Sequence, residues 1–181
     1  MKHTVLLGLG SNIGDRIEFI AIAIRAIADL DRTVVDDVSG VYHTEPVGDV
    51  VQDYFLNVCI SVKTDLDVEE FHRSIKKMEK DIGRQQSTRW GPREIDIDIL
   101  FFDATVVQTE HLTIPHREIV NRRFVLQPLS EIAPMAVHPV ERRSVEQLLA
   151  ECTDAHAIEF DGKYSTQLLA LINDSIANPT V

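Results

Sequence analysis

The pattern of apolar and polar positions predicts a strand, a helix and a second strand at the start of the chain. Residues 3–9 form a short apolar run that ends in glycine, and residues 33–43 are rich in Val and Tyr, so both segments are predicted strands. Between them, isoleucines recur every three or four residues, which is typical of one face of a helix that ends near Asp31. The residues of this stripe are Ile17, Ile20, Ile24 and Ile27.

A similar succession follows after a loop. Residues 44–53 contain Pro46 and Gly48, which favour a loop, and residues 56–63 alternate between apolar and polar side chains, as a half-buried strand does. Asp67, with Glu70 three positions later, predicts the start of a second helix. Its apolar stripe consists of Val68, Phe71, Ile75, Met78 and Ile82, and Gly83 is expected to end it. Residues 84–93 then form a polar loop, and residues 95–102 (IDIDILFF) form a fourth strand.

The order strand, helix, strand, strand, helix, strand predicts an α+β fold with a ferredoxin-like βαββαβ core, in which two helices cover one face of an antiparallel sheet. A hairpin over residues 105–113 is expected next, then a short helical stretch near Glu118 and a Pro-punctuated segment up to Pro139. Residues 144–152 and 165–176 look helical. We therefore expect one domain over residues 1–143, followed by an acidic helical extension over 144–181 that packs on it or continues it.

Composition and charge exclude several classes of protein. The 181 residues carry a net charge of −11, which disfavours non-specific binding to nucleic acids and to anionic membranes. Two cysteines, Cys59 and Cys152, are too few for a disulfide framework or a zinc site, and we interpret Cys59 as inert. Neither a membrane span nor a secretory signal is evident. We expect a cytoplasmic protein, monomeric with a dimer as the alternative, that acts on small molecules.

Asp96 and Asp98 are the sharpest chemical feature. Side chains alternate on a strand, so the two carboxylates point to the same side, while Ile95, Ile97, Ile99 and Phe101 point to the other. Adjacent carboxylates repel each other unless a cation lies between them, and Mg²⁺ is commonly held by one or two carboxylates plus substrate phosphates. On the spacing alone, the alternative interpretation is a solvated face of the sheet that carries two surface acids.

Basic side chains flank this acid pair. Arg84, Arg89 and Arg93 precede it in a segment without acids, and His116, Arg122 and Arg123 follow it. In a chain of negative net charge, such a local excess of cations indicates an anionic ligand, and arginine suits phosphate. Cations beside a metal-binding acid pair are typical of a site for a metal–polyphosphate. Ion pairing with the chain's own acids is the alternative interpretation.

Other motifs narrow the choice of site. The chain has no P-loop motif, and the glycines of residues 8–14 (GLGSNIG) fit the dinucleotide fingerprint poorly, so we interpret them as a tight turn beside a ligand. Phe55 and Asn57 open the third strand, and an aromatic ring with an amide suits a flat heterocycle. Their positions alone favour the other interpretation, a packed Phe and a loop-fixing Asn. Trp90 lies in the arginine loop, where it would cover a ligand. The histidines His72, His138 and His156 are interpreted as surface residues.

The segment 89–100 (RWGPREIDIDIL) resembles the signature of the 6-hydroxymethyl-7,8-dihydropterin pyrophosphokinases, enzymes of folate biosynthesis. Further segments agree in unbroken order from about residue 4 to 140, among them residues 8–12 (GLGSN), 42–48 (YHTEPVG), 112–116 (LTIPH) and 121–124 (NRRF). The resemblance implies a ferredoxin-like fold and transfer of pyrophosphate from MgATP to the pterin hydroxymethyl group, with release of AMP.

The resemblance also implies roles for individual residues. Asp96 and Asp98 would bind two Mg²⁺ ions, and Arg84 and Arg93 would act on the migrating group as catalytic residues. The pterin site would comprise Gly10, Thr44, Pro46, Val47, Phe55, Asn57 and Phe124. The ATP site would comprise Glu79, Arg84, Arg89, Trp90, Arg93, Ile99, Thr113, His116 and Arg122.

Some positions depart from the family pattern. The segment between Gly83 and Arg89 is one residue shorter than in well-known members, Phe55 replaces a Tyr, and Lys76 stands where some members have Gln. Two other functions remain open: a palm-like nucleotidyltransferase, which also places acid pairs on such a sheet, and a nucleotide-binding module without turnover. The negative net charge argues against the first, and the intact acid pair with its arginines argues against the second.

Overall fold

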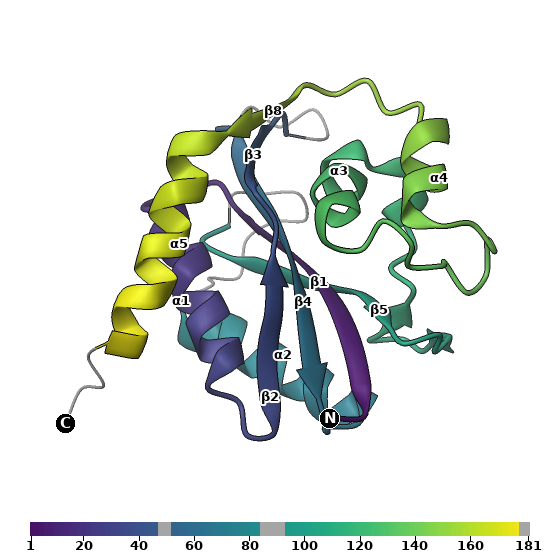
Figure 1. The fold of residues 1–181 in the computed structure, drawn as a ribbon, viewed down its shortest axis with the longest axis horizontal. Helices are drawn as coiled ribbons and strands as arrows, with labels where there is room; N and C mark the ends of the chain where they lie inside the picture. Colours follow the sequence, from purple (N-terminus) through teal and green to yellow (C-terminus); the bar gives the residue numbers. More distant parts are fainter. Residues whose placement is uncertain (47–51, 84–92, 178–181) are drawn as a thin grey trace.

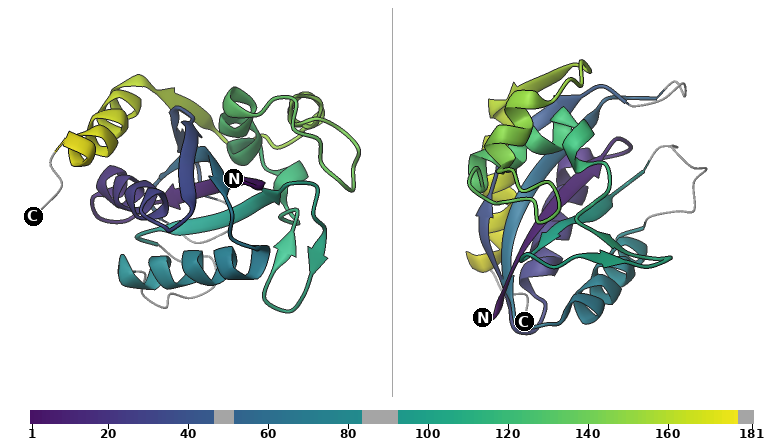
Figure 2. Two further views of the ribbon diagram at one scale, coloured as in Figure 1. Left: turned by 60° about the horizontal axis from the view of Figure 1, so that its bottom comes forward. Right: turned by 90° about the vertical axis from the view of Figure 1, so that its right-hand side faces the viewer.

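The computed structural model describes residues 1–46, 52–83 and 93–177, and it is an antiparallel sheet covered by helices on both faces (Figures 1 and 2). The elements are, in chain order, β1 (His3–Ser11), α1 (Arg16–Ala28), β2 (Thr33–Val38), β3 (Val41–Thr44), β4 (Phe55–Thr64), α2 (Val68–Asp81), β5 (Asp96–Phe102), β6 (Val107–Gln108), β7 (Thr113–Ile114), a 3₁₀ turn η1 (Ile119–Asn121), α3 (Arg123–Ile132), α4 (Val145–Glu151), β8 (Ile158–Asp161) and α5 (Gly162–Ala177). None of the described helices is both long and apolar enough to cross a bilayer.

Strand β1 lies between β4 and β5 in a sheet with the order β5-β1-β4-β3-β8, and β2 also pairs with β4. All of these pairings are antiparallel. Gly10 of β1 faces Asn57 on one side and Asp96 on the other. The register therefore brings the predicted pterin side and the predicted metal side together at the carboxyl end of β1.

The predicted strand over residues 33–43 is in fact two strands. Both β2 and β3 pair with β4, and they are separated at Ser39 and Gly40. Ser39 takes over the hydrogen bonds of the interrupted ladder, because its Oγ accepts from the Cys59 N–H at 2.9 Å. The Gly40 N–H donates to a Glu131 carboxylate oxygen of α3 at 2.7 Å. A contact with a distant helix thus divides the strand, which local sequence could not reveal.

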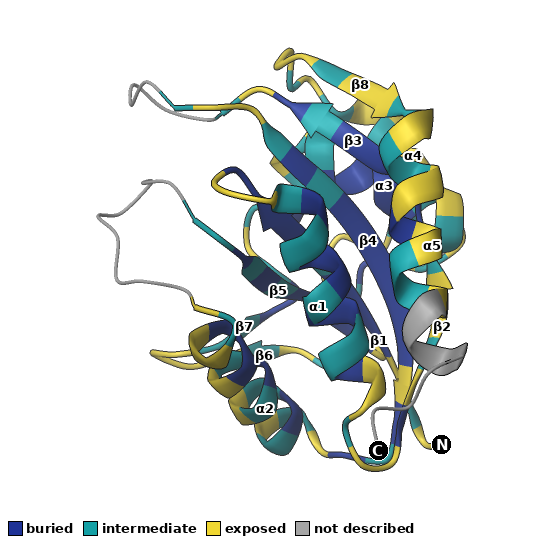
Figure 3. Ribbon diagram, turned by 90° about the vertical axis from the view of Figure 1, so that its left-hand side faces the viewer, coloured by how far each residue is buried: buried dark blue, intermediate teal, exposed yellow. Residues whose placement is uncertain are grey.

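The two helices that the sequence predicts cover one face of the sheet. Apolar side chains of α1 and α2 pack there against β1, β4 and β5, as the stripes of Ile17, Ile20, Ile24, Ile27, Phe71 and Ile75 predict. The caps are also as expected, since Asp67 and Glu70 form a capping box and Gly83 has a φ of 111° at the end of α2. Burial of the sheet between its helices is visible in Figure 3.

The opposite face is covered by α3 and α4, which pack on Leu6, Cys59, Leu100 and Phe101. Phe101 was expected to share a face with Ile97 and Ile99, and this expectation was wrong. The pairing of β1 with β5 shifts by one residue between Leu6 and Leu7, so the alternation of β5 reverses at Leu100. Phe102 consequently packs with the α1–α2 core, and Phe101 packs under α3.

Two elements in the second half of the chain were not predicted as such. Residues 123–132 form α3 in spite of Pro128, because Val125, Leu126 and Leu129 bury an apolar face on the sheet. Strand β8 lies in the segment expected to be helical, where it pairs with β3 and extends the sheet. The predicted helices over 144–152 and 165–176 are present as α4 and α5, and α5 lies beside α1 (Figure 2).

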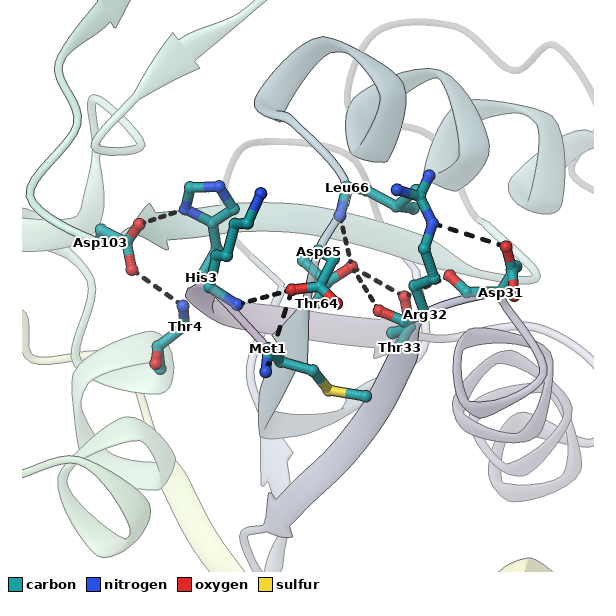
Figure 4. A network of polar contacts seen from close by, with 11 residues as sticks. Met1, His3, Thr4, Asp31, Arg32, Thr33, Thr64, Asp65, Leu66 and Asp103 are labelled. Carbon is teal, nitrogen blue, oxygen red and sulfur yellow. Dashed lines mark hydrogen bonds and ion pairs between the residues drawn. The ribbon is translucent and has the colours of Figure 1, made fainter.

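The amino end of β1 is held by a set of hydrogen bonds (Figure 4). Asp103 accepts from the Thr4 N–H at 2.8 Å and contacts His3 Nδ1 at 2.7 Å. Thr64 Oγ1 lies 2.8 Å from Thr33 Oγ1 and accepts from the Leu66 N–H at 3.1 Å. These contacts join β1, β2, β4 and the turn after β5 at the end of the sheet away from Gly10, and they fix the strands relative to one another.

His138 was interpreted as a surface residue, but it is buried, with 6% of its surface exposed. Its ring packs edge-on against Phe101, and Nδ1 accepts from the Val140 and Glu141 N–H groups at 3.3 and 3.1 Å. Burial lowers the pKa of His138 below its usual value of 6.5, an effect that Glu141 opposes and Arg143 reinforces. The folded protein therefore holds this imidazole neutral, since a proton on Nδ1 would remove both hydrogen bonds.

We predict that His138 makes the free energy of unfolding depend on pH. Because the folded-state pKa is lowered, the contribution of neutral His138 is complete above the unfolded-state pKa of about 6.5 and is lost as the pH falls through it. His138→Asn keeps an acceptor oxygen near the position of Nδ1 but does not titrate. The free energy of unfolding, measured by urea titration, should fall more for the wild type than for this variant between pH 7 and pH 5. An equal fall for both proteins would contradict the prediction.

Candidate active site

Two adjoining pockets meet at β5, where Asp98 lines both of them. The first pocket lies between β1, β4, β5 and the start of α3, and its lining includes Gly10, Thr44, Gln52, Phe55, Asn57, Arg93, Asp96, Leu100, Arg122 and Phe124. The second lies between α2, β5 and the β6–β7 hairpin, and its lining includes His72, Lys76, Ile99, His111, Leu112, Thr113, His116 and Arg117. A ligand in one pocket would thus meet a ligand in the other at Asp98.

The two acids of β5 both reach the first pocket, as the strand alternation predicts. Burial raises the pKa of Asp98 above its usual value, and the negative charge of Asp96 raises it further. His116 Nε2 lies 3.8 Å from Asp98 Oδ2, and burial lowers the pKa of His116, so this imidazole contributes little positive charge. A cation between the carboxylates would relieve their repulsion.

Asp96 and Asp98 fit a magnesium site that substrate completes. Among the described residues no group of three or more His, Cys, Asp or Glu side chains is arranged to hold a metal ion. Such a group is typical of sites made by protein alone, whereas Mg²⁺ is often bound by one or two carboxylates together with substrate phosphates. The carboxylate pair meets this second description.

Arg93 lies immediately before β5 and brings positive charge to the acids. Its guanidinium forms a short ion pair with Asp96, and Arg93 and Asp96 both line the first pocket. Arg122 lines the same pocket, with its guanidinium carbon 5.7 Å from the centre of the Phe124 ring. Two guanidinium groups therefore line the first pocket together with its two acids, which suits a phosphate group.

The first pocket is also lined by an amide and two aromatic rings. Asn57 Nδ2 donates to Thr44 Oγ1 at 2.6 Å, which fixes the amide of Asn57 across β3 and β4. Phe55 and Phe124 are half-buried and line the pocket, in contrast to the fully packed phenylalanines of the core. An aromatic face beside a fixed amide is suited to a flat, hydrogen-bonding heterocycle.

Gly10 leaves the space in front of this amide open. A Cβ at position 10 would lie 2.7 Å from Asn57 Oδ1 and 3.7 Å from the Phe55 ring. The first of these distances is shorter than a van der Waals contact, so any side chain would push the amide aside. Glycine at position 10 therefore lets the main chain of β1 lie close to the Asn57 amide. The sequence likewise indicates that the glycines of residues 8–14 lie beside a ligand.

The second pocket contains several of the predicted ATP residues, namely Ile99, Thr113 and His116. Glu79, another of them, is buried behind this wall. Its Oε1 accepts from the Ile97 N–H at 2.8 Å, and its Oε2 accepts from Lys76 Nζ at 2.8 Å. Ile97 lies between the two acids on β5, so Glu79 holds the free edge of the strand that carries them.

The structure brings most of the described candidate residues together, with a few differences. Arg93 and Arg122, expected at the ATP site, line the first pocket with the predicted pterin residues, and Pro46 and Glu79 line neither pocket. Val47, Arg84, Arg89 and Trp90 lie outside the described residues. Lys76, noted from the sequence only as a departure from the family pattern, lines the second pocket with His72, which was interpreted as a surface residue.

Sequence reasoning overlooked several lining residues, among them Gln52, Leu100, Leu112 and Arg117. Gln52 and Leu100 carry no signal of their own, because a polar loop residue and an apolar strand residue are expected anywhere. Arg117 does carry one, since it follows His116 directly in the basic stretch after the hairpin. Cys59 is buried at the back of the first pocket, and burial raises the pKa of its thiol, as expected of an unreactive cysteine.

Comparison with known proteins gives consistent results. A family model described as 7,8-dihydro-6-hydroxymethylpterin-pyrophosphokinase (HPPK) matches residues 6–134. A protein of Aquifex aeolicus named 2-amino-4-hydroxy-6-hydroxymethyldihydropteridine pyrophosphokinase is 42% identical over 151 residues, which cover 83% of this chain and 92% of that protein. A Bacillus subtilis protein of the same name is 39% identical over 73% of this chain and 79% of its own length.

Solved structures show a similar fold. A crystal structure of Plasmodium falciparum HPPK-DHPS aligns with a TM-score of 0.67 at 18% sequence identity, over 82% of this chain. This chain spans only 43% of that longer protein. It likewise spans 37% of a Lactococcus lactis protein named bifunctional protein FolKE, to which it is 43% identical.

Proposed function

Because this chain belongs to the 7,8-dihydro-6-hydroxymethylpterin-pyrophosphokinase family, we propose that its two adjoining pockets are the sites at which it joins pterin and ATP. The enzyme transfers pyrophosphate from ATP to the hydroxymethyl group of 6-hydroxymethyl-7,8-dihydropterin and releases AMP, a step of folate biosynthesis. We assign the pterin to the first pocket and ATP to the second. The observation that carries this assignment is that Asp98 lines both pockets, so substrates bound in the two pockets would meet beside this acid.

The core is a ferredoxin-like arrangement in this proposal, with β2 and β3 together in the place of its second strand. The order β5-β1-β4-β3 and the antiparallel pairings support this assignment. Residues 1–143 would form the catalytic domain, and residues 144–181 an extension of it, since β8 pairs with β3 and α5 packs on α1. We propose a cytoplasmic protein that binds neither nucleic acid nor membrane, which its net charge of −11 supports. We also propose a monomer, because residues of one chain line both pockets.

In the first pocket the pterin ring would lie against Phe55 and Phe124, with its polar edge on the Asn57 amide. Thr44 holds that amide in one orientation, so its donor and acceptor positions are set before the substrate arrives. The hydroxymethyl group would then point toward β5 and the second pocket. Such positioning converts the encounter of two substrates into a reaction between adjacent groups.

Asp96 and Asp98 would hold two Mg²⁺ ions together with the phosphates of ATP. Ions held there would neutralise phosphate charge and would lower the pKa of the attacking hydroxyl group. Arg93 and Arg122 would bind phosphate oxygens from the first-pocket side, with Arg84 and Arg89 as further candidates from the family resemblance. Glu79 and Lys76 act behind β5, where they keep the acids in register through Ile97.

The reaction itself needs few side chains. The hydroxymethyl oxygen forms a bond to the β-phosphorus, the bond between that phosphorus and the α,β-bridging oxygen breaks, and AMP leaves. Negative charge develops on the oxygens of the transferred pyrophosphoryl group and on the leaving oxygen of AMP. Guanidinium groups near these oxygens would lower the barrier. The hydroxyl proton would pass to solvent, because the two other carboxylates that line the described pockets, Glu45 and Glu110, are exposed and so lack the burial that would make them strong bases.

Product analysis tests this function. The protein is incubated with MgATP and 6-hydroxymethyl-7,8-dihydropterin, and the nucleotides are separated by chromatography. AMP should appear in equal amounts with a pyrophosphorylated pterin. Formation of ADP would contradict attack at the β-phosphorus, and pterin binding without turnover would favour a nucleotide-binding module.

A prediction for the pterin pocket concerns Gly10 and Asn57. Asn57→Ala removes the heterocycle contact, and Gly10→Ala displaces the same amide through a 2.7 Å contact. Each should weaken pterin binding about tenfold or more, the cost of one buried polar contact, with ATP affinity largely kept. Titration of each ligand on each variant measures both effects. Gly8→Ala is the comparison, because its Cβ would meet Leu100 at an ordinary 3.5 Å and should cost less.

A further inference from the structure

Asn12, directly after β1, holds both neighbours of that strand through one buried side chain. Its N–H donates to the Arg93 carbonyl at 3.1 Å, and its Oδ1 accepts from the Arg93 N–H at 2.8 Å. Its Nδ2 donates to Gln52 Oε1 at 3.0 Å and to the Asp53 carbonyl at 3.4 Å. Asn12 is 3% exposed and does not itself line either pocket as the structure describes them.

The contacts of Asn12 continue the sheet beyond its last regular pair. Residues of β1 exchange main-chain hydrogen bonds with β4 and β5 as far as the Gly10 and Ser11 positions. At Asn12 the two bonds with Arg93 take the form of one more ladder pair, in which a side-chain oxygen replaces the main-chain carbonyl. On the other side of β1, Asn12 Nδ2 donates to Gln52 and Asp53, which directly precede β4 in the sequence.

The residues on the two sides of Asn12 belong to the active site. Gln52 lines the first pocket, and Arg93 lines it too and pairs with Asp96. The side chain of Arg93 is long, so its reach toward a phosphate depends on where its main chain is held. Because one buried amide holds the Arg93 main chain and the Gln52 side chain together, a displacement on either side is transmitted to the other.

We propose that Asn12 is a positioning residue that fixes Arg93 and Asp96 relative to the pterin side of the pocket. This inference rests on the proposed function and adds to it a residue that touches neither substrate. Asn12 acts by keeping the attacking hydroxymethyl group and the phosphate-binding groups aligned. Its loss should therefore reduce the rate of the bound complex more than the affinity for either substrate, because small misplacements of aligned groups are costly to rate.

The test compares Asn12→Ala and Gln52→Ala with wild type, and the exposed Asn173→Ala on α5 is the matched control. We measure kcat from AMP formation, the Kd of pterin, and the Kd of α,β-methylene-ATP with Mg²⁺. Asn12→Ala should lower kcat about tenfold to a hundredfold, with both Kd values changed less than about threefold. Gln52→Ala, which removes one arm of the contact, should give a smaller loss of kcat, and Asn173→Ala none.

Hydrogen exchange at the Arg93 amide provides a readout that does not need turnover. This amide should exchange faster in Asn12→Ala and remain protected in Gln52→Ala. A wild-type kcat in Asn12→Ala, or a loss matched by an equal rise in Kd, would overturn the proposal, as would unchanged exchange at Arg93. If Asn12→Ala does not fold, Gln52→Ala decides, and an unaltered kcat there overturns it. Absence of AMP with wild-type protein would refute the proposed function separately, and the exchange measurement would still decide whether Asn12 holds Arg93.

Discussion

Asp96→Ala is expected to abolish Mg²⁺-dependent AMP formation, with a fall in kcat of at least about a thousandfold. A metal ion contributes several kcal/mol of charge stabilisation to a phosphoryl-type transfer, and each 1.36 kcal/mol is a factor of ten in rate. Asp96 lies in the first pocket on the same side of β5 as Asp98, so removing it leaves one carboxylate for the proposed metal site. The measurement is initial rate against Mg²⁺ concentration at saturating ATP and pterin.

The loss should not come from unfolding. The negative charge of Asp96 raises the pKa of Asp98, so its removal relieves repulsion between like charges, although it also ends the ion pair with Arg93. The two effects oppose each other, so the midpoint temperature of thermal unfolding should change by only a few degrees. Asp36→Ala is the matched control, because Asp36 is an exposed strand carboxylate paired with Lys63 on β4. Turnover within about tenfold of wild type in Asp96→Ala would contradict the proposed metal site.

Much of the fold could be predicted from the chain because its signals are local. The isoleucine stripe of α1, the capping box of α2 and the alternation of β4 each lie within one element, and each is present in the structure. Strand β8, the break at Ser39 and Gly40, and the reversal at Leu100 were missed. All three depend on a partner distant in the sequence: β3 for the strand, Glu131 for the break, and β1 for the shift in register.

The candidate site divides in the same way. The spacing of Asp96 and Asp98 was enough to place both acids on one side of β5, because strand alternation is a local rule. The adjacency of Gly10, Asn57 and Asp96 follows from the pairing of three strands and could only be inferred from family resemblance. Residues such as Gln52 and Lys76 show no pattern in the sequence, since their importance comes from what lies opposite them.

Arg93→Ala is expected to slow the transfer about a hundredfold to a thousandfold while ATP binding weakens much less. Removing one well-placed donor to developing charge typically costs that much in kcat. Arg93 is positioned for such a role, since its main chain is held by Asn12 and its guanidinium lies beside Asp96 in the first pocket. Single-turnover rates at saturating substrates, together with the Kd of α,β-methylene-ATP, separate the two effects.

Two further variants sharpen the interpretation of Arg93. Arg93→Lys keeps the charge but loses the planar fork that binds two oxygens at once, so it should recover only part of the rate. Arg143→Ala is the matched control, because Arg143 pairs with Glu141 and Glu151 beside α4, on elements that line neither pocket. An equal loss in kcat/KM and in ATP affinity, with kcat unchanged, would mean that Arg93 binds ground state and transition state alike. Because Arg93→Ala also releases Asp96 from its ion pair, the Mg²⁺ concentration for half-maximal rate should not rise, and a rise would indicate that Arg93 supports the metal site rather than the migrating group.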